Sequence, residues 1–76
     1  MFTRHARQRM ELRGVSDEDV EWALRRPIGD PRAGEPGTMW VWGHASGTRV
    51  LKVCVRVADP KVVISVAWQD EGGIGP

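Results

Sequence analysis

Residues 2–20 read FTRHARQRMELRGVSDEDV and define two helices with a sharp boundary between them. The first helix is predicted over about residues 4–13, because a threonine can cap its start and Gly14 can supply the left-handed residue that closes it. Ser16 then caps a second helix over about residues 16–25, and the acidic residues that follow complement the positive end of its dipole. The chain therefore begins with two short, well-delimited helices.

Strands are predicted for the second half of the chain. Residues 27–37 carry three prolines, which predicts a loop without regular structure. Beyond it, apolar and polar residues alternate in three runs, over about residues 38–44, 49–57 and 61–69. The connections are short enough for hairpins, so an antiparallel meander is expected. The sequence thus predicts an α+β fold in two layers, with the N-terminal helices packed on a three- to four-stranded antiparallel sheet.

The composition fits one small domain over residues 1–70, followed by a flexible tail over residues 71–76. Of the 76 residues, 41% are hydrophobic and 28% are charged, which is typical of a globular chain. One cysteine and two histidines exclude an intramolecular disulfide and a structural zinc site, so neither a metal nor another cofactor is expected. The sequence shows no membrane span and no signal peptide, which predicts a cytoplasmic protein without membrane contact.

The faces of the last two strands follow from alternation. One side of each strand is apolar and is expected to meet the helices. These residues are Leu51, Val53, Val55 and Val57, then Val62, Ile64, Val66 and Trp68. The opposite side is mixed and basic and includes Lys52, Cys54, Arg56 and Ser65. Such a surface suits contact with a ligand.

The strand predicted over residues 38–44 can be oriented in two ways. If Met39 and Val41 lie inside, then Trp40, Trp42 and His44 share the open face with Lys52 and Arg56. Aromatic rings among cations favour single-stranded RNA, because bases stack on the rings while cations follow the phosphates. In the alternative, the tryptophans fill the core.

His5, Arg9 and Arg13 are spaced four residues apart, so they share one face of the first helix. Histidine is the natural proton carrier near neutral pH, and one arginine guanidinium can donate two parallel hydrogen bonds to a phosphate. RNA cleavage without a metal needs both functions. His5 and Arg9 are therefore the candidate catalytic residues, and His44 is a candidate second proton carrier. Candidate contacts to RNA are Arg13, Lys52, Arg56, Trp40, Trp42 and His44.

A structural interpretation of the same residues is also open. The His5 ring could bond a strand carbonyl, and Arg9 could pair with Glu11, Asp17 or Asp19. A cation at the position of Arg13 is favoured by the end of its own helix, by about 0.3–1 kcal/mol. Cys54 suits a small apolar filler, since no adjacent base marks it as a nucleophile.

The stretch HARQRMELRGVSDEDV over residues 5–20 resembles a family of small bacterial domains of unknown function. That family is distantly similar to BrnT and RelE-type toxins, which pack N-terminal helices on an antiparallel sheet and cleave RNA. The resemblance implies a RelE-like fold and a toxin-like endoribonuclease with His5, Arg9 and Ser65 at functional positions. It also implies RNA as a partner, including ribosome-bound mRNA, and a cognate antitoxin protein.

The alternative function is a protein-interaction module without enzymatic activity, as one partner of a two-gene system or as a homodimer. The net charge of only +1 favours it, because dedicated RNA-binding proteins are often more basic. A small-molecule enzyme is disfavoured, because the sequence has no phosphate-binding loop and no nucleophile motif.

Overall fold

The computed structural model describes residues 1–71 of the chain. The tail predicted over residues 71–76 lies outside the described residues, except for the backbone of Glu71. Within the described part, no helix has the length and apolarity needed to cross a membrane. In chain order, the elements are α1 (Arg4–Arg13), α2 (Asp17–Arg25), β1 (Arg32–Ala33), β2 (Thr38–His44), β3 (Val50–Arg56), β4 (Val63–Trp68) and the short 3₁₀ helix η1 (Gln69–Glu71).

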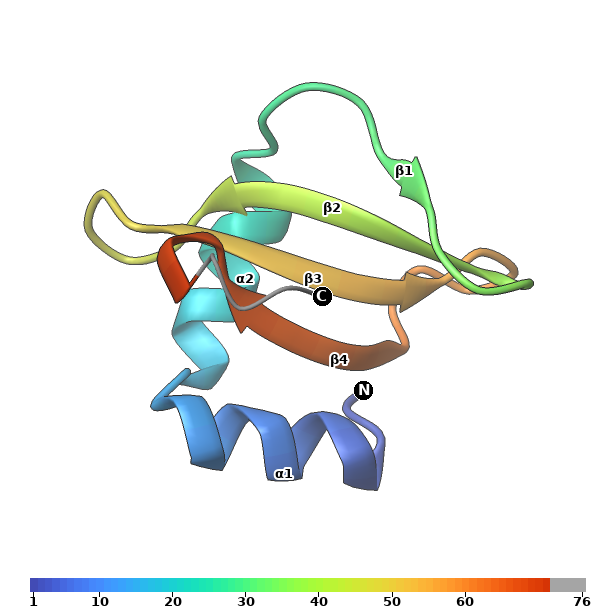
Figure 1. The fold of residues 1–76 in the computed structure, drawn as a ribbon, viewed down its shortest axis with the longest axis horizontal. Helices are drawn as coiled ribbons and strands as arrows, with labels where there is room; N and C mark the ends of the chain where they lie inside the picture. The colour runs from blue at the N-terminus through green and yellow to red at the C-terminus, as the bar shows by residue number, and fades with distance from the viewer. Residues whose placement is uncertain (72–76) are drawn as a thin grey trace.

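The four strands form one antiparallel sheet in the order β1-β2-β3-β4. Figure 1 shows α2 crossing behind β2 and β3, while α1 runs along β4. Among residues 1–71, neither α1 nor α2 covers the side of the sheet turned to the viewer, and we call it the open face. The predicted α+β fold, with two helices packed on an antiparallel sheet, is confirmed.

The helix boundary arises from local capping. The Thr3 hydroxyl accepts a hydrogen bond from the Ala6 amide at 3.1 Å, and Gly14 closes α1 in the left-handed conformation with a φ of 66°. At α2, Ser16 and Asp19 cap each other reciprocally, each side chain accepting from the other's amide at 3.0 Å. The Asp19 carboxylate also accepts hydrogen bonds from the amide and hydroxyl of Ser46, in the β2–β3 turn. One carboxylate thus fastens the start of α2 to the sheet.

Asp19 should make the stability of the fold sensitive to acid. Burial raises the pKa of this carboxyl, but the hydrogen bonds from Ser16 and Ser46 outweigh burial and hold its pKa below the ordinary 3.8. Because the folded pKa is the lower one, the stabilisation is complete above pH 3.8 and is lost as the pH falls through the folded pKa. We expect Asp19→Asn to lower the free energy of unfolding by about 1–3 kcal/mol near neutral pH.

Urea denaturation of both proteins at a series of pH values tests this expectation. The difference between wild type and Asp19→Asn should shrink in acid. Glu18→Gln is the matched control, since it removes an exposed carboxylate from the same helical turn. A constant difference at all pH values would mean that the ionised state of Asp19 contributes nothing.

The segment predicted as an irregular loop over residues 27–37 contains β1, which corrects that prediction. Arg32 pairs with Trp40 and Ala33 with Met39 along the outer edge of β2. A strand of two residues is too short to produce an alternating pattern, and the prolines on either side conceal it. An edge position tolerates such prolines, because only one side of the strand needs hydrogen bonds.

The orientation of β2, which the sequence left open, is settled by packing. Met39 and Val41 contact the buried core, so the alternate residues Trp40 and Trp42 lie on the open face. Gly43 lets α2 lie directly against β2, because a Cβ at that position would fall 1.9 Å from the Ala23 carbonyl oxygen. The core consists of Ala6, Met10, Val15, Val20, Ala23, Ala45, Leu51, Val53, Val55, Val63, Val66 and Trp68.

The predicted core pattern of the last two strands needs two corrections. A bulge between β3 and β4 pairs Val55 with Val63 and Cys54 with Ser65, so that strict alternation breaks at Ile64. Val63 therefore joins the core cluster in the place predicted for Ile64, which is only half-buried. Val57 was predicted to face the helices but is 53% exposed, because β3 ends at Arg56.

Candidate nucleic-acid interface

The open face carries two tryptophans, each with a cation over its ring. The Lys52 ammonium lies 5.5 Å from the centre of the Trp40 ring, and the Arg32 guanidinium lies 5.3 Å from that of Trp42. Both tryptophans are half-buried, so part of each ring remains accessible. These contacts satisfy the distance at which a cation is attracted to an aromatic face.

Each of the two cations lies over a different tryptophan from the one that its own residue pairs with in the sheet. Lys52 is paired with Trp42 across β2 and β3, yet its ammonium reaches Trp40. Arg32 is paired with Trp40 across β1 and β2, yet its guanidinium reaches Trp42. Positive charge and aromatic surface therefore alternate along β2.

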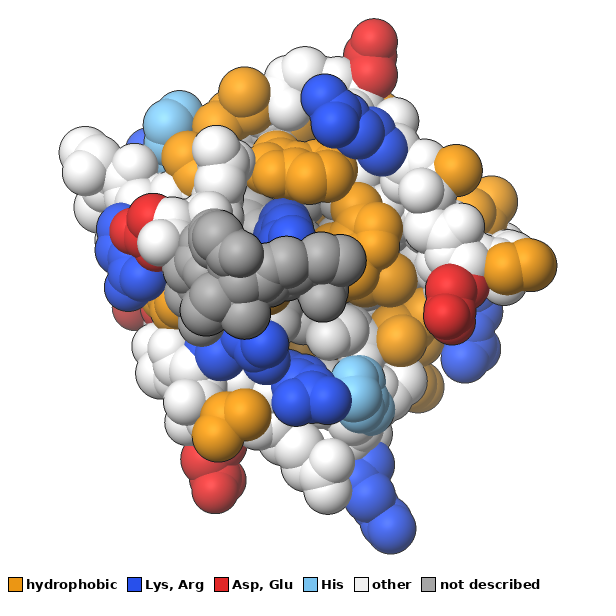
Figure 2. Space-filling view, in the orientation of Figure 1, with side chains coloured by type: hydrophobic (Ala, Val, Ile, Leu, Met, Phe, Trp, Pro, Cys, Tyr) orange, Lys and Arg blue, Asp and Glu red, His pale blue; other side chains and the backbone are white. Residues whose placement is uncertain are grey.

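The predicted catalytic pair lies together on α1. Arg9 Nε donates a hydrogen bond to His5 Nε2 over 3.4 Å, where His5 is exposed and Arg9 is half-buried. Figure 2 shows Lys and Arg side chains gathered with a His on the α1 side of the visible surface, next to apolar side chains over the sheet.

The carboxylates that could have paired with Arg9 have other partners. Arg7 donates to both oxygens of Asp17, at 2.6 and 3.3 Å. Asp19 is engaged by Ser16 and Ser46. Within residues 1–71, Arg9 therefore pairs with a histidine and not with Asp17 or Asp19.

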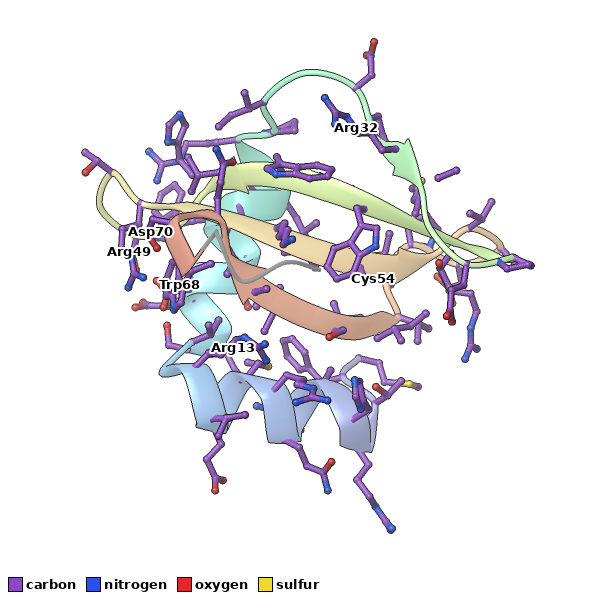
Figure 3. The ribbon with its side chains drawn as sticks, in the orientation of Figure 1. Arg13, Arg32, Arg49, Cys54, Trp68 and Asp70 are labelled. Atoms are coloured by element: carbon purple, nitrogen blue, oxygen red, sulfur yellow. The ribbon has the colours of Figure 1, made fainter. Side chains whose placement is uncertain are left out.

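Arg13 is the last residue of α1, and its backbone contacts Trp68. Its carbonyl accepts a hydrogen bond from the Trp68 indole nitrogen at 2.8 Å, which ties the helix to the end of β4. Figure 3 labels Arg13 between α1 and the sheet and Arg32 beyond β2, on opposite sides of the open face. The two arginines therefore flank this surface.

The remaining predicted contacts divide into a central and a peripheral group. Lys52 and Ser65 lie in the middle of the sheet, with Ser65 half-buried and paired with Cys54. His44 and Arg56 pair with Val50 and Thr38 at opposite ends of the β2–β3 ladder. Six residues of strand separate those ends, or about 20 Å. His44 and Arg56 therefore cannot act on one phosphate group.

His5 and His44 are also far apart. Residues 1–3 hold the start of β4, where Phe2 bridges to Val63, so α1 begins beside the Val55 end of β3. His44 lies at the Val50 end of that strand, five residues or about 17 Å away. The even-numbered face of β2 is turned outwards, as a role for His44 as second proton carrier requires; that role stays a prediction, and this separation argues against joint action with His5 on one scissile bond.

A polar pocket beside Trp42 contains residues that sequence reasoning missed as site residues. It has a volume of about 640 Å³ and is lined by residues 28–32, Trp42 and Gln69. Asp30 and Arg32 come from the proline-rich connection, where no periodic pattern assigns a face. Alternation does place Gln69 on the open side, but only the fold brings it to Trp42.

The η1 turn that carries Gln69 is anchored by its neighbours. Arg49 donates two hydrogen bonds to Asp70, at 3.0 and 2.8 Å, and lies 3.9 Å above the Trp68 ring. The hydrogen bonds and charge of Arg49 hold the pKa of the Asp70 carboxyl below its ordinary value. Gln69 therefore stands on a fixed turn next to the pocket.

The described part of the chain contains no cluster of side chains that could bind a metal ion, and its cysteine is buried. Among residues 1–71, no three His, Cys, Asp or Glu side chains gather in a way that could hold a metal ion. Cys54 is buried at the centre of β3 (Figure 3) and forms no disulfide.

Comparison with known proteins identifies the family but no function. A family model described as Domain of unknown function (DUF4258) matches residues 2–68. Neither a curated protein nor a solved structure matches the chain. The similarity to BrnT and RelE-type toxins accordingly stays a prediction. Because the matched residues include both helices and all four strands, the chain belongs to the DUF4258 family of domains of unknown function.

Proposed function

We propose that this protein binds single-stranded RNA on the open face of its sheet. The observation that supports the proposal most is the pair Trp40 and Trp42, each with a cation over its ring. They lie two residues apart on one strand, or about 6.6 Å. Consecutive bases of an extended strand can stack on such rings, and each stacked base contributes about 1–3 kcal/mol.

Phosphate contacts would come from both sides of the tryptophans. Lys52 and Arg32 lie over the rings, so a base that stacks on a ring displaces a cation, which can then reach the phosphate of that nucleotide. Arg9 and Arg13 on α1 extend the positive surface beyond β4. The net charge of +1 does not oppose this, because the arrangement of charges on one face determines the local field.

We extend the proposal to RNA cleavage of the kind that the toxin resemblance implies. His5 Nε2 accepts from Arg9 Nε in the free protein, and once Arg9 turns to the phosphate this nitrogen can take the proton of a ribose 2′-hydroxyl. The 2′ oxygen then attacks the adjacent phosphorus and the bond to the 5′ oxygen breaks, which leaves a 2′,3′-cyclic phosphate and a 5′-hydroxyl. Arg9, beside the imidazole, would stabilise the charged phosphorane. The imidazolium returns its proton to the leaving oxygen.

The binding proposal is tested with tryptophan variants. We expect Trp40→Ala and Trp42→Ala each to weaken the binding of a single-stranded oligonucleotide about tenfold, through loss of stacking. Fluorescence anisotropy of a labelled RNA measures the affinity, and affinity should also fall as salt is raised.

Trp22→Ala is the matched control for the tryptophan variants. Trp22 is 41% exposed on α2 and also lies below an arginine, with Arg26 4.7 Å from its ring centre. It lies on the helix layer and should not contact RNA. Equal losses in all three variants would contradict the assignment of the open face.

Docking of a protein partner is a second candidate function. An apolar cavity of about 330 Å³ favours it, lined by Leu24, Pro27, Gly29, Pro31, Met39, Val41, Val55 and Pro60 on the helix side of the sheet. A docking module would bind RNA at most through its exposed cations, with an affinity that Trp40→Ala and Trp42→Ala leave unchanged. The anisotropy titration therefore separates the two functions.

A further inference from the structure

The pocket beside Trp42 is large enough to hold a nucleobase. Its volume of about 640 Å³ lies in the usual range for small-ligand pockets. The Trp42 indole provides an aromatic wall, while residues 28–32 and Gln69 line the space from two separate segments of the chain. A planar ring stacked on Trp42 would therefore have the polar side chains of Asp30, Arg32 and Gln69 among its neighbours.

The polar side chains of this pocket have free hydrogen-bonding capacity. In the described part of the chain, Asp30 and Gln69 make no side-chain hydrogen bond or ion pair. Arg32 contacts the face of Trp42. Asp30 is the unusual member, because a carboxylate repels phosphate and offers acceptors alone. On an RNA-binding face, it fits a base edge that presents N–H donors.

Guanine matches this pair of charged residues better than the other three bases. Its N1–H and N2–H₂ groups form two adjacent donors for a carboxylate, and its O6 and N7 atoms form two adjacent acceptors for a guanidinium. These edges adjoin on the ring, and Asp30 and Arg32 are two residues apart in the chain. Adenine would set its N1 acceptor against the carboxylate, and uracil offers it a single donor.

We propose that this pocket selects guanine in single-stranded RNA, an inference that rests on the proposed RNA binding. The base stacks on Trp42 in the place that the Arg32 guanidinium occupies in the free protein. Arg32 then donates to O6 and N7, Asp30 accepts from N1–H and N2–H₂, and Gln69 closes the pocket.

The test compares oligouridine with the same oligouridine carrying one central guanosine. We expect the guanosine to raise the affinity of the wild-type protein about tenfold. Asp30→Asn should remove that preference, so that its affinities for the two oligonucleotides agree within about twofold. Glu35→Gln is the matched control, because it removes an exposed carboxylate from the same connection outside the pocket. It should retain the preference for guanosine.

Titration with GMP and UMP, followed by NMR, separates this inference from the proposed function. RNA binding without a preference for guanosine, or a preference that survives in Asp30→Asn, would overturn the guanine pocket and leave RNA binding in place. Binding of GMP that Asp30→Asn abolishes, in a protein that binds no RNA, would uphold the pocket and overturn the proposed function. Absence of both RNA and GMP binding would overturn both.

Discussion

Replacement of Gly43 by alanine is expected to lower the free energy of unfolding by about 3 kcal/mol or more. The added Cβ would lie 1.9 Å from the carbonyl oxygen of Ala23, 2.6 Å from its carbonyl carbon and 2.9 Å from its Cα. All three are backbone atoms in the last turn of α2, so no side-chain rotation relieves the clash. A domain of this size has a small margin of stability. Chemical denaturation followed by circular dichroism should show a large drop in the midpoint.

Two further variants establish the cause of the Gly43→Ala effect. Adding Ala23→Gly should not restore stability, because the clashing atoms remain when the Ala23 side chain is removed. Val57→Ala changes a residue that is 53% exposed and should alter stability by less than about 0.5 kcal/mol. A Gly43→Ala protein as stable as wild type would mean that α2 does not lie against β2 at this point.

His5→Ala is expected to reduce the rate of RNA cleavage about 100-fold or more, since a positioned proton carrier contributes about 10²–10⁴-fold. RNA affinity should change little, because His5 lies on α1, away from the tryptophans. His5 is exposed, so its loss leaves no cavity in the core. Single-turnover cleavage of a labelled oligonucleotide measures the rate, and circular dichroism checks the fold.

His44→Ala is the matched control for His5→Ala. It removes the other histidine, which lies at the far end of the sheet, and should leave cleavage unchanged. If His5→Ala unfolds the protein, His5 is structural. If the variant folds and cleaves RNA at the wild-type rate, the proton-carrier role is wrong. A wild-type protein that binds RNA without cutting it would refute cleavage alone.

The helices could be predicted from the sequence because their boundaries are local. Capping by Thr3, closure by Gly14 and the reciprocal Ser16–Asp19 cap each depend on residues at most four positions apart. The contact between Asp19 and Ser46 spans 27 residues, so no local pattern could reveal it. The acidic residues at the start of α2 indicated only that they complement the helix dipole. In the structure Asp19 also accepts a hydrogen bond from Ser46, which joins α2 to the β2–β3 turn.

The sheet could be predicted only in outline. Alternation places Met39 and Trp40 on opposite sides of β2, but both are apolar, so composition cannot say which side is buried. The deciding factor is Gly43, which allows α2 to cover the Met39 side. The bulge at Ile64 likewise depends on pairing with β3.

The candidate interface could be predicted only where its residues are close together in the sequence. His5 and Arg9 meet because they are one helical turn apart. The Trp42 pocket instead joins residues 28–32 to Gln69, which are about 40 positions apart in the sequence. Only the folded chain brings those segments together.

Both outer edges of the sheet are partly occupied by the chain itself. Beside β2 lie β1 and the bond from the Ile28 amide to the Trp42 carbonyl, and beside the start of β4 lie residues 1–3. Unpaired strand edges are the usual templates for intermolecular β-pairing and aggregation. At these positions the backbone groups are already bonded within the molecule. The protein should therefore resist fibril growth by edge-to-edge addition at these positions.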